Sequence, residues 1–369
     1  MNIGWVYPCS RRCGIAMYSA AYVDALRSLA GVRCFDLDGY CGRPAALAAA
    51  VNACDLVHVQ YETTFFLRGR GDWYGRFCRR VTRPLFVTLH EVYRRFPFVF
   101  PREQITGGAV MKTLKTWLYD ARHPMLTAYR RHEAAGFHAA SLLVHYDYQK
   151  RILADRGVDP GRIAVLAHPV RPAPAGPDDP WTRPAQLHLV SAGFVTPAYD
   201  YDLLFASLDM VEPPWRFTWI GGLRREEDRP LLARVEDLVA ARGWRDRFTV
   251  TGWLDDAARD RFLATAHVYL ALFSHRSASG SLTVAVGARQ CIIATRIECT
   301  EELVRQGAAM MVVDRDAGQV AGAVRKVRDD RKLREKLREE CARYTEANSY
   351  ARLAVTLAGM YDETIRAAA

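Results

Sequence analysis

The sequence contains no run of about 20 apolar residues, the length that a membrane-spanning helix requires. Its beginning, MNIGWVYPCSRRCG, lacks a basic stretch followed by a long apolar one, and so does not look like a secretion signal. We therefore expect a cytoplasmic protein. The GxGxxG fingerprint of dinucleotide-binding enzymes is also missing, which argues against hydride transfer.

Cysteine patterns typical of zinc sites are missing as well. The nine cysteines are scattered, without paired CxxC spacings or histidines at zinc-site distances. We expect free thiols; a redox pair of Cys9 and Cys13, which share one predicted loop, is the alternative. The net charge of +10 favours an anionic partner such as a nucleotide diphosphate, anionic lipid or nucleic acid.

Short apolar runs alternate with helical patterns along the whole chain. This alternation indicates parallel sheets covered by helices on both faces. The expected strands of the first half are 2–8, 32–37, 55–60, 84–89, 141–146 and 162–168. A proline-rich stretch at 169–186 is the expected linker. The pattern then restarts, and the expected strands of the second half are 187–193, 216–222, 248–252, 267–273, 291–295 and 308–313.

The length of 369 residues allows about two domains. The sequence therefore predicts an α/β protein with two Rossmann-like, doubly wound domains that face each other across a cleft. The predicted domains are 1–170 and 171–346, and an amphipathic helix at 347–369 ends the chain.

Open α/β sheets bind ligands at the carboxyl ends of their strands, so the loops there hold the candidate residues. Gly14 opens the first helix, where amides and the helix dipole favour an anion, or it only permits a tight turn. His90 follows one strand and should point into the cleft, and Tyr61 and Glu62 follow another and should be exposed to the same cleft. The alternatives are a structural role for His90 and helix capping for Glu62.

In the second half, Ser279, Gly280 and Ser281 open a helix and can donate hydrogen bonds to a phosphate, with Arg276 as countercharge. The alternative is that one serine is simply an N-cap. Trp253 follows a strand and either flanks a base or packs against the protein. The remaining ligand-site candidates of this half are Gly193, Thr196, Gly222 and Glu302.

In order and spacing, six motifs resemble the retaining family-4 glycosyltransferases of the GT-B fold. The motifs are CGIAMYS, DLVHVQYE, VTLHEV, LVSAGFVTPAYDYDLLFASL, FTVTGWLDDAARDRFLATAHVYLALF and SASGSLTVAVGARQCIIAT. The resemblance implies that the C-terminal domain holds a nucleotide-sugar and the N-terminal domain holds the acceptor. It also implies that helix 347–369 packs back on the first domain.

The activity that the resemblance implies is hexose transfer from a nucleotide-diphosphate sugar, with retention of configuration and without a metal or other cofactor. A glycan or lipid-linked acceptor, in surface polysaccharide or lipopolysaccharide synthesis, is the expected partner. His90 and Arg276 take the catalytic roles, and Tyr61 and Glu62 bind the acceptor. The expected donor-binding residues are Gly14, Gly193, Thr196, Gly222, Trp253, Ser279, Gly280, Ser281 and Glu302.

The chain departs from the family pattern at three places. Arg276 and Val284 stand where two glutamates are usual, and Phe194 and Tyr199 stand where an arginine and a lysine usually contact the diphosphate. The usual Gly-x-Pro after the helix is Arg-Gln-Cys at 289–291. A catalytically inactive binding or partner protein of the same fold is therefore the alternative.

The segment 102–132 interleaves basic and aromatic residues at helical spacing, which suits docking on an anionic membrane surface; an ordinary surface helix is the alternative. We do not expect nucleic-acid binding, because the sequence holds no recognised module for it. A sugar-nucleotide epimerase of the same architecture is a further alternative.

Overall fold

The computed structural model describes residues 1–11, 13–68, 71–94, 124–174, 180–181, 186–224 and 226–368, together with five separate positions between 108 and 118. The chain divides into two compact units. The first is made of residues 1–167 and 350–369, and the second of residues 168–349. The expected boundaries were 170 and 346, so each observed boundary lies three residues from the expected one.

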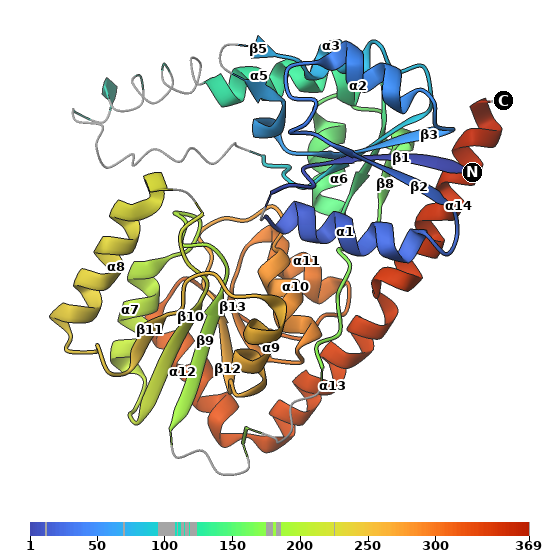
Figure 1. The fold of residues 1–369 in the computed structure, drawn as a ribbon. Helices are drawn as coiled ribbons and strands as arrows, with labels where there is room; N and C mark the ends of the chain where they lie inside the picture. Colours follow the sequence, from blue (N-terminus) through green and yellow to red (C-terminus); the bar gives the residue numbers. More distant parts are fainter. Residues whose placement is uncertain are drawn as a thin grey trace. The chain divides into compact units, whose positions relative to one another are not determined.

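The first unit contains a parallel sheet of six strands in the order β2-β1-β3-β6-β7-β8 (Figure 1). The strands are β1 (Asn2–Tyr7), β2 (Gly31–Asp36), β3 (Leu56–Tyr61), β6 (Leu85–Leu89), β7 (Ser141–Val144) and β8 (Ile163–Val165). Strands β3 and β6 are buried along their whole length, which explains why their sequences are mostly apolar, with His58, Gln60 and Thr88 as polar exceptions. β2, at the sheet edge, exposes half of its six residues.

Helices cover both faces of this sheet. They are α1 (Gly14–Leu26), α2 (Pro44–Val51), α3 (Tyr74–Cys78), α5 (Pro124–His132), α6 (Asp147–Asp155) and α14 (Tyr350–Ala368). The smaller elements are η1 (Thr63–Phe66), β4 (Leu67–Arg68), β5 (Gly71–Asp72), η3 (Glu133–Phe137) and η4 (Pro160–Arg162).

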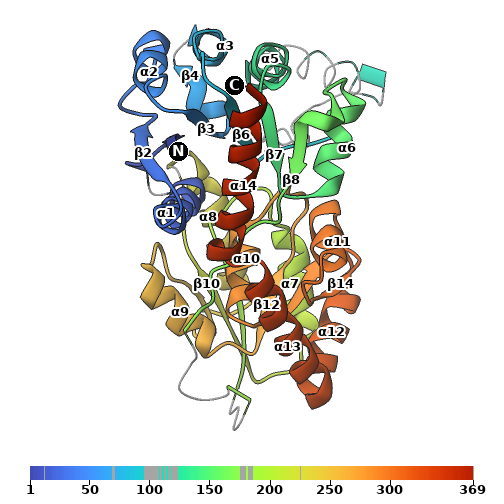
Figure 2. The same ribbon diagram turned by 90° about the vertical axis from the view of Figure 1, so that its right-hand side faces the viewer.

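The last helix, α14, packs beside α1 and completes the core of the first unit (Figure 2). Leu357 and Tyr361 of α14 join a buried cluster with Trp5 and Tyr22. The hydroxyl of Tyr361 also bonds to Nδ1 of His58 inside the sheet. The end of the chain therefore belongs physically to the unit that the beginning of the chain forms.

The second unit contains another parallel sheet of six strands, in the order β11-β10-β9-β12-β13-β14. The strands are β9 (Leu187–Ala192), β10 (Trp215–Ile220), β11 (Phe248–Val250), β12 (Val268–Ala271), β13 (Cys291–Thr295) and β14 (Met311–Val313). The helices are α7 (Tyr201–Met210), α8 (Arg229–Ala241), α9 (Asp256–Ala264), α10 (Gly280–Gly287), α11 (Glu298–Arg305), α12 (Ala317–Asp329) and α13 (Arg331–Ala347), with the short η5 (Glu226–Asp228).

Aspartates cap four of these helices, which explains where the helices begin. Asp200, Asp255, Asp316 and Asp330 each accept a hydrogen bond from the backbone amide three residues later. Such a cap stabilises a helix by about 1 kcal/mol, because it satisfies one of the amides that the first turn leaves unpaired.

The two connections between the units meet at one point. Val170 forms an isolated parallel bridge with Ser349, and its amide donates to the carbonyl of Asn348 at 2.9 Å. Next to this bridge the carbonyl of Gly287, at the end of α10, accepts from the amide of Ala173 at 3.0 Å. Gly287 has no room for a side chain, because a Cβ there would lie 2.1 Å from the carbonyl oxygen of Arg171.

The predicted α/β fold with two Rossmann-like sheets is confirmed, and all twelve expected strands are present. Several expected strands were too long at the carboxyl end: 141–146, 162–168 and 267–273 end at Val144, Val165 and Ala271. The apolar residues past these ends are buried in loops, so burial continued where strand pairing had stopped. Of the expected linker 169–186, residues 175–179 and 182–185 lie outside the described residues.

Candidate functional site

The order of the strands locates a candidate site in each unit. In the second sheet the chain order reverses between β9 and β12, and in the first sheet between β1 and β3. Ligands of open α/β sheets bind at such switch points, beyond the carboxyl ends of the strands. The loops that follow these four strands are therefore the ones to examine.

In the second unit, four loops at the carboxyl edge are held together by glycines. Gly193 has φ 120°, and a Cβ on it would lie 3.5 Å from Ser281. Gly221 has φ 139°, and a Cβ there would lie 2.1 Å from the carbonyl oxygen of Gly193. A Cβ on Gly222 would lie 3.1 Å from the Cα of Gly252. Only glycine permits the positive φ values and the close backbone approaches together.

The helix α10 begins at this edge. Ser279 is its N-cap: its Oγ accepts from the amide of Leu282 at 3.3 Å and lies 3.2 Å from the Oγ of Ser281. Gly280 is exposed, and a Cβ built on it would meet no atom within 4 Å. The first turn of α10 therefore presents amides and a hydroxyl at the positive end of a helix dipole, a setting that suits an anion.

Arg276 supplies a positive charge beside this helix start. Its Nη2 donates to the Oγ1 of Thr196 at 3.4 Å, its guanidinium lies 5.4 Å from the ring of Phe273, and its buried Nε has no hydrogen-bond partner. Burial raises the pKa of Tyr269, while the hydrogen bond to Ser281, that to Ala192 and the charge of Arg276 oppose the rise. Arg276 is thus electrostatically coupled to the residue that bonds the carbonyl of Ser281.

The surroundings of the residue before Arg276 disfavour its charged form. Burial, followed by the charges of Arg276 and Arg315, lowers the pKa of His275. Arg315 itself is engaged, because it pairs with Asp200 at the start of α7. Of the two arginines, Arg276 and Arg315, only Arg276 forms no ion pair with a carboxylate in the described part of the chain.

Two aromatic rings also lie in the loops at this carboxyl edge. Trp253, in the loop after β11, is 47% exposed, and its ring stacks on that of Phe194 with centroids 5.5 Å apart and planes 22° apart. Sequence reasoning missed Phe194 and Gly252 as members of this edge. The signal was their position, since each lies within two residues of the end of a strand.

The positions that depart from the family pattern have structural roles. Tyr199 is buried, and its hydroxyl lies 2.8 Å from the Oγ of Ser191 and donates to the carbonyl of Leu270 at 3.1 Å. Arg289 adopts the left-handed conformation with φ 53° at the position of the family's glycine. Val284 is half-buried on α10. Tyr199, which stands where the family usually has a lysine, is therefore part of the buried core under the loop.

Glu302 does not join this edge as an exposed group. It lies on α11, is 2% exposed, and pairs with Arg305 at 2.6 Å. We therefore do not include it in the donor site proposed below.

In the first unit, Gly14 begins α1, at the end of the loop that follows β1 at the switch point. Cys13, its N-cap residue, makes no side-chain hydrogen bond to the helix, and a Cβ on Gly14 would meet no atom within 4 Å. Packing therefore does not demand a glycine here, and the first amides of α1 have no side-chain cap from Cys13.

His90 directly follows β6 and is 8% exposed. Its Nε2 lies 2.9 Å from the Oε1 of Gln60, and its ring packs edge-on against Tyr18 with centroids 4.8 Å apart. Sequence reasoning missed Gln60. The signal in the sequence was a polar residue within the mostly apolar strand β3. Gln60 is fully buried, and a buried polar side chain requires a hydrogen-bond partner.

The expectation that Tyr61 is exposed is wrong. Tyr61 ends β3, is 1% exposed, and its hydroxyl lies 2.7 Å from Nδ1 of His132 and 3.1 Å from Oγ1 of Thr63. The strand runs one residue further than predicted, and α5 covers the ring. Glu62 is also mostly buried, at 7% exposed, and accepts a hydrogen bond from Thr64.

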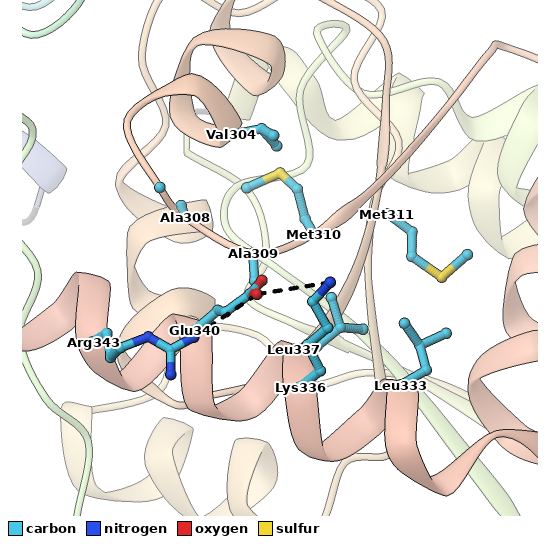
Figure 3. A pocket seen from close by; sticks show the side chains of 11 residues that line it. Val304, Ala308, Ala309, Met310, Met311, Leu333, Lys336, Leu337, Glu340 and Arg343 are labelled. Atoms are coloured by element: carbon cyan, nitrogen blue, oxygen red, sulfur yellow. Dashed lines mark ion pairs between the residues drawn. The ribbon is translucent and has the colours of Figure 1, made fainter.

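A cavity of about 510 Å³ lies elsewhere in the second unit (Figure 3). It is lined by the end of α11, the start of β14 and one face of α13, with Met310, Met311 and Leu337 around it and Glu340 paired with Lys336 and Arg343 at its rim. The cavity adjoins the amino end of β14, whereas the loops at the switch point follow the carboxyl ends of β9 and β12.

Three further observations concern metals, thiols and membranes. The structure describes all nine cysteines, and none of them is in a disulfide. The part of the chain that the structure describes contains no group of three or more His, Cys, Asp or Glu placed to hold a metal ion. Across the described ranges, no helix is both long and apolar enough to cross a membrane.

The predicted membrane-docking segment 102–132 lies largely outside the described residues, including Lys112, Lys115 and Trp117. Ala128 and Tyr129 of α5, at the end of this segment, are buried, whereas the four described apolar residues between 108 and 118 are exposed. Their exposed fractions are 84% for Val110, 48% for Met111, 47% for Leu114 and 38% for Leu118.

Comparison with known proteins agrees with this fold. Residues 187–330 match the model of the family described as glycosyl transferases group 1. No curated protein matches the chain in sequence.

Solved structures that resemble the chain have low sequence identity but nearly complete coverage. HepE of Anabaena, in complex with UDP and glucose, has a TM-score of 0.72 at 12% identity, with 98% of this chain and 100% of that chain covered. Sucrose-phosphate synthase of Thermosynechococcus elongatus has a TM-score of 0.71 at 15% identity, with both chains fully covered. WaaG, described as a glycosyltransferase involved in lipopolysaccharide biosynthesis, has a TM-score of 0.64 at 14% identity, with 98% of this chain and 99% of that chain covered.

The chain therefore has the GT-B fold of the glycosyltransferases. The residues that match the group 1 glycosyl transferase model, 187–330, lie in its second unit. The resemblance to GT-B glycosyltransferases that the sequence motifs predicted is thus confirmed.

Proposed function

We propose that the chain transfers a hexose from a nucleotide-diphosphate sugar to a hydroxyl of a glycan or lipid-linked acceptor. The observation that carries the proposal is the exposed start of α10 at the switch point of the second sheet, with Ser281 and Arg276 beside it. Backbone amides, a hydroxyl and a guanidinium without a carboxylate partner suit a diphosphate. The complex of HepE with UDP supports the same class of ligand.

In the proposed reaction, the bond between the anomeric carbon and the diphosphate breaks, and negative charge grows on the leaving phosphate. The amides at Gly280 and Ser281, together with Arg276, stabilise that charge, which is usually the dominant contribution in such catalysis. The acceptor hydroxyl attacks from the face that the diphosphate leaves and gives its proton to the leaving phosphate. Configuration is thereby retained, and the helix and the guanidinium make a metal unnecessary.

The donor site that we propose comprises Gly193, Thr196, Gly222, Trp253, Arg276 and the start of α10. Gly14, at the start of α1, would contact the diphosphate with its amide. His90 would position the transferred sugar, because Gln60 and Tyr18 hold its ring. Glu62 would accept from acceptor hydroxyls. Tyr61 keeps a supporting role beneath Glu62, since its hydroxyl is buried.

We further propose that the protein is cytoplasmic and docks on the inner face of the cell membrane through 102–132. Val110, Leu114 and Leu118 are spaced four residues apart, which places them on one face if the segment is helical, and all three are exposed. Lys112 and Lys115 lie between them in sequence. Apolar and basic residues in this arrangement suit anionic lipid. Such a location would bring the protein to a lipid-linked precursor of a surface polysaccharide or lipopolysaccharide.

A binding protein without catalytic activity is the second candidate. It is favoured by the loop after β9, where Phe194 and Tyr199 replace the usual phosphate-binding cations and Tyr199 is held in the core. In this case the chain would bind a nucleotide-sugar, or serve an active transferase, without turnover.

Binding and hydrolysis of UDP-, GDP- and dTDP-sugars test the proposal. We expect one donor to bind and to be hydrolysed slowly, with EDTA leaving the rate unchanged and the anomer of the product showing retention by NMR. Arg276→Met should weaken donor binding, whereas Val355→Ala on the exposed face of α14 should not. Binding without hydrolysis or transfer would favour an inactive donor-binding protein, and no binding of any donor by the folded protein would refute the transferase and leave only an inactive partner protein.

A further inference from the structure

Trp253 is an exception among the tryptophans of the second unit. Its exposed fraction is 47%, whereas Trp215, Trp219 and Trp244 are at most 4% exposed and Trp181 is half-buried. A single exposed ring is not unusual on a protein surface. Trp253, however, is not isolated, because it stacks on the half-buried ring of Phe194 with centroids 5.5 Å apart. The pair therefore presents a supported flat ring to solvent.

The backbone fixes the two rings relative to each other. Phe194 lies in the loop after β9 and Trp253 in the loop after β11, and Gly222 after β10 joins these loops. The carbonyl of Gly222 accepts from the amide of Val195 at 2.9 Å, and its Cα side faces Gly252 so closely that a Cβ would lie 3.1 Å away. The stacked pair is thus built on three adjacent strand ends, which is a rigid support.

The same backbone sets the position of the rings relative to the start of α10. Phe194 directly follows Gly193, and a Cβ on Gly193 would lie 3.5 Å from Ser281. Consecutive Cα atoms are about 3.8 Å apart, so the aromatic pair begins one residue away from the proposed diphosphate site. In a nucleoside diphosphate the ribose separates the base from the phosphates. A surface that binds the base should therefore lie close to the diphosphate site, as the aromatic pair does.

Chemistry points to the same ligand group. Phe194 stands where family members usually have an arginine for the diphosphate, and a phenyl ring cannot take that role. Two stacked rings instead offer a π-face to a flat aromatic group, and every nucleobase has such a face.

We propose that Phe194 and Trp253 form a stacking platform that binds the nucleobase of the donor. This inference rests on the proposed function, because it places the base of the same nucleotide-sugar whose diphosphate binds at α10. Trp253 contacts the base, and Phe194 supports Trp253 from its other side. Stacking makes the platform sensitive to the presence of a base, whereas hydrogen-bonding groups would decide which base is preferred.

Isothermal titration with UDP and with inorganic pyrophosphate, on the full chain, tests the platform. We expect Trp253→Leu to weaken UDP binding by about ten-fold or more, the order of effect of a base–aromatic stack, and to leave pyrophosphate binding unchanged. Phe194→Leu should give a smaller loss, and Trp253→Phe should restore most of the affinity. Met210→Ala, at an exposed residue of α7, is the control and should behave as wild type.

Tryptophan fluorescence gives a second readout that does not depend on turnover. UDP should quench the emission of the wild-type protein and of the control, pyrophosphate should not, and Trp253→Leu should abolish the quenching by UDP. If UDP binds wild type and Trp253→Leu equally well, the platform is refuted while the donor site stands. If neither UDP nor pyrophosphate binds the folded wild-type protein, the proposed diphosphate site fails, and the platform fails with it.

Discussion

Gly193 and Ser281 lie opposite each other at the carboxyl edge of the second sheet. A Cβ on Gly193 would stand 3.5 Å from both the Cβ and the Oγ of Ser281, and the φ of Gly193 is 120°. The loop after β9 and the start of α10 are therefore in direct contact, although 88 positions separate the two residues in sequence. This contact defines the floor of the proposed donor site.

The substitution Gly193→Val should remove donor binding and reduce stability. A branched side chain would press on Ser281, and the positive φ would strain the backbone by about 1–3 kcal/mol. We expect UDP affinity to fall more than ten-fold in titration calorimetry, with a lower unfolding midpoint. Gly322→Ala is the matched control: this residue of α12 has open space around it, and alanine is the better helix former. Wild-type affinity in Gly193→Val would show that the loop does not form the site.

Ser279 and Ser281 should separate helix capping from ligand binding. Ser279→Ala removes the N-cap of α10 and should cost about 1 kcal/mol of stability. Ser281 does not cap the helix, since its Oγ bonds to the Oγ of Ser279, so Ser281→Ala should change stability little and weaken pyrophosphate binding several-fold. Urea unfolding and calorimetry on both variants measure the two effects. Unchanged pyrophosphate affinity in Ser281→Ala would show that Ser281 does not bind the phosphate and that Ser279 acts only as a helix cap.

Buried histidines should make the protein less stable in mild acid. Burial lowers the pKa of His58 to about 3, and mainly burial lowers those of His168 and His188 to about 4, from 6.5. The unfolded chain takes up protons below about 6.5 while the folded state stays neutral, so stability is complete above that pH and is lost as the pH falls toward 4. Each ring adds a slope of up to about 1.4 kcal/mol per pH unit.

Urea unfolding at several values between pH 8 and pH 5 measures this loss. His58→Gln should flatten the pH dependence, whereas the substitution of exposed His138 by Gln should not. An unfolding midpoint that stays constant from pH 8 to pH 5 would contradict the neutral state of the buried rings.

The attachment of α14 should depend on Tyr361. Its hydroxyl bonds Nδ1 of His58 in the sheet, and the ring is fully buried. Tyr361→Phe keeps the ring but leaves the histidine without that partner, so we expect a loss of about 1–3 kcal/mol. Thermal and urea unfolding measure it. Val355→Ala, at a residue of the same helix that is 59% exposed, should stay within about 0.5 kcal/mol of wild type.

Much of the fold could be predicted from local pattern. The apolar strands β3, β6, β9 and β13 are buried on both faces, so their continuous hydrophobic runs identified them as inner parallel strands. The ends of strands were less predictable. Tyr61 shows why: whether a tyrosine ends a strand or begins a loop depends on the cover that α5 provides, and α5 lies about 65 positions further along the chain.

The candidate site could be predicted in part. The residues Ser279 to Ser281 indicate the start of a helix, and glycines directly after strands indicate tight turns. Gln60 and Phe194 could not be assigned, because their partners, His90 and Trp253, lie 30 and 59 positions away. Glu302 was misleading, because its burial and its pairing with Arg305 arise from the packing of α11.

The sequence by itself determined the alternation of strands and helices, the glycine and serine positions that suit a phosphate, and the two-unit plan, because these follow from short-range periodicity and local turn chemistry. The tertiary structure alone decided the order of strands in each sheet, and with it the switch points. It also decided which side chains are buried at those points, because contacts between distant segments depend on long-range packing that no local pattern encodes.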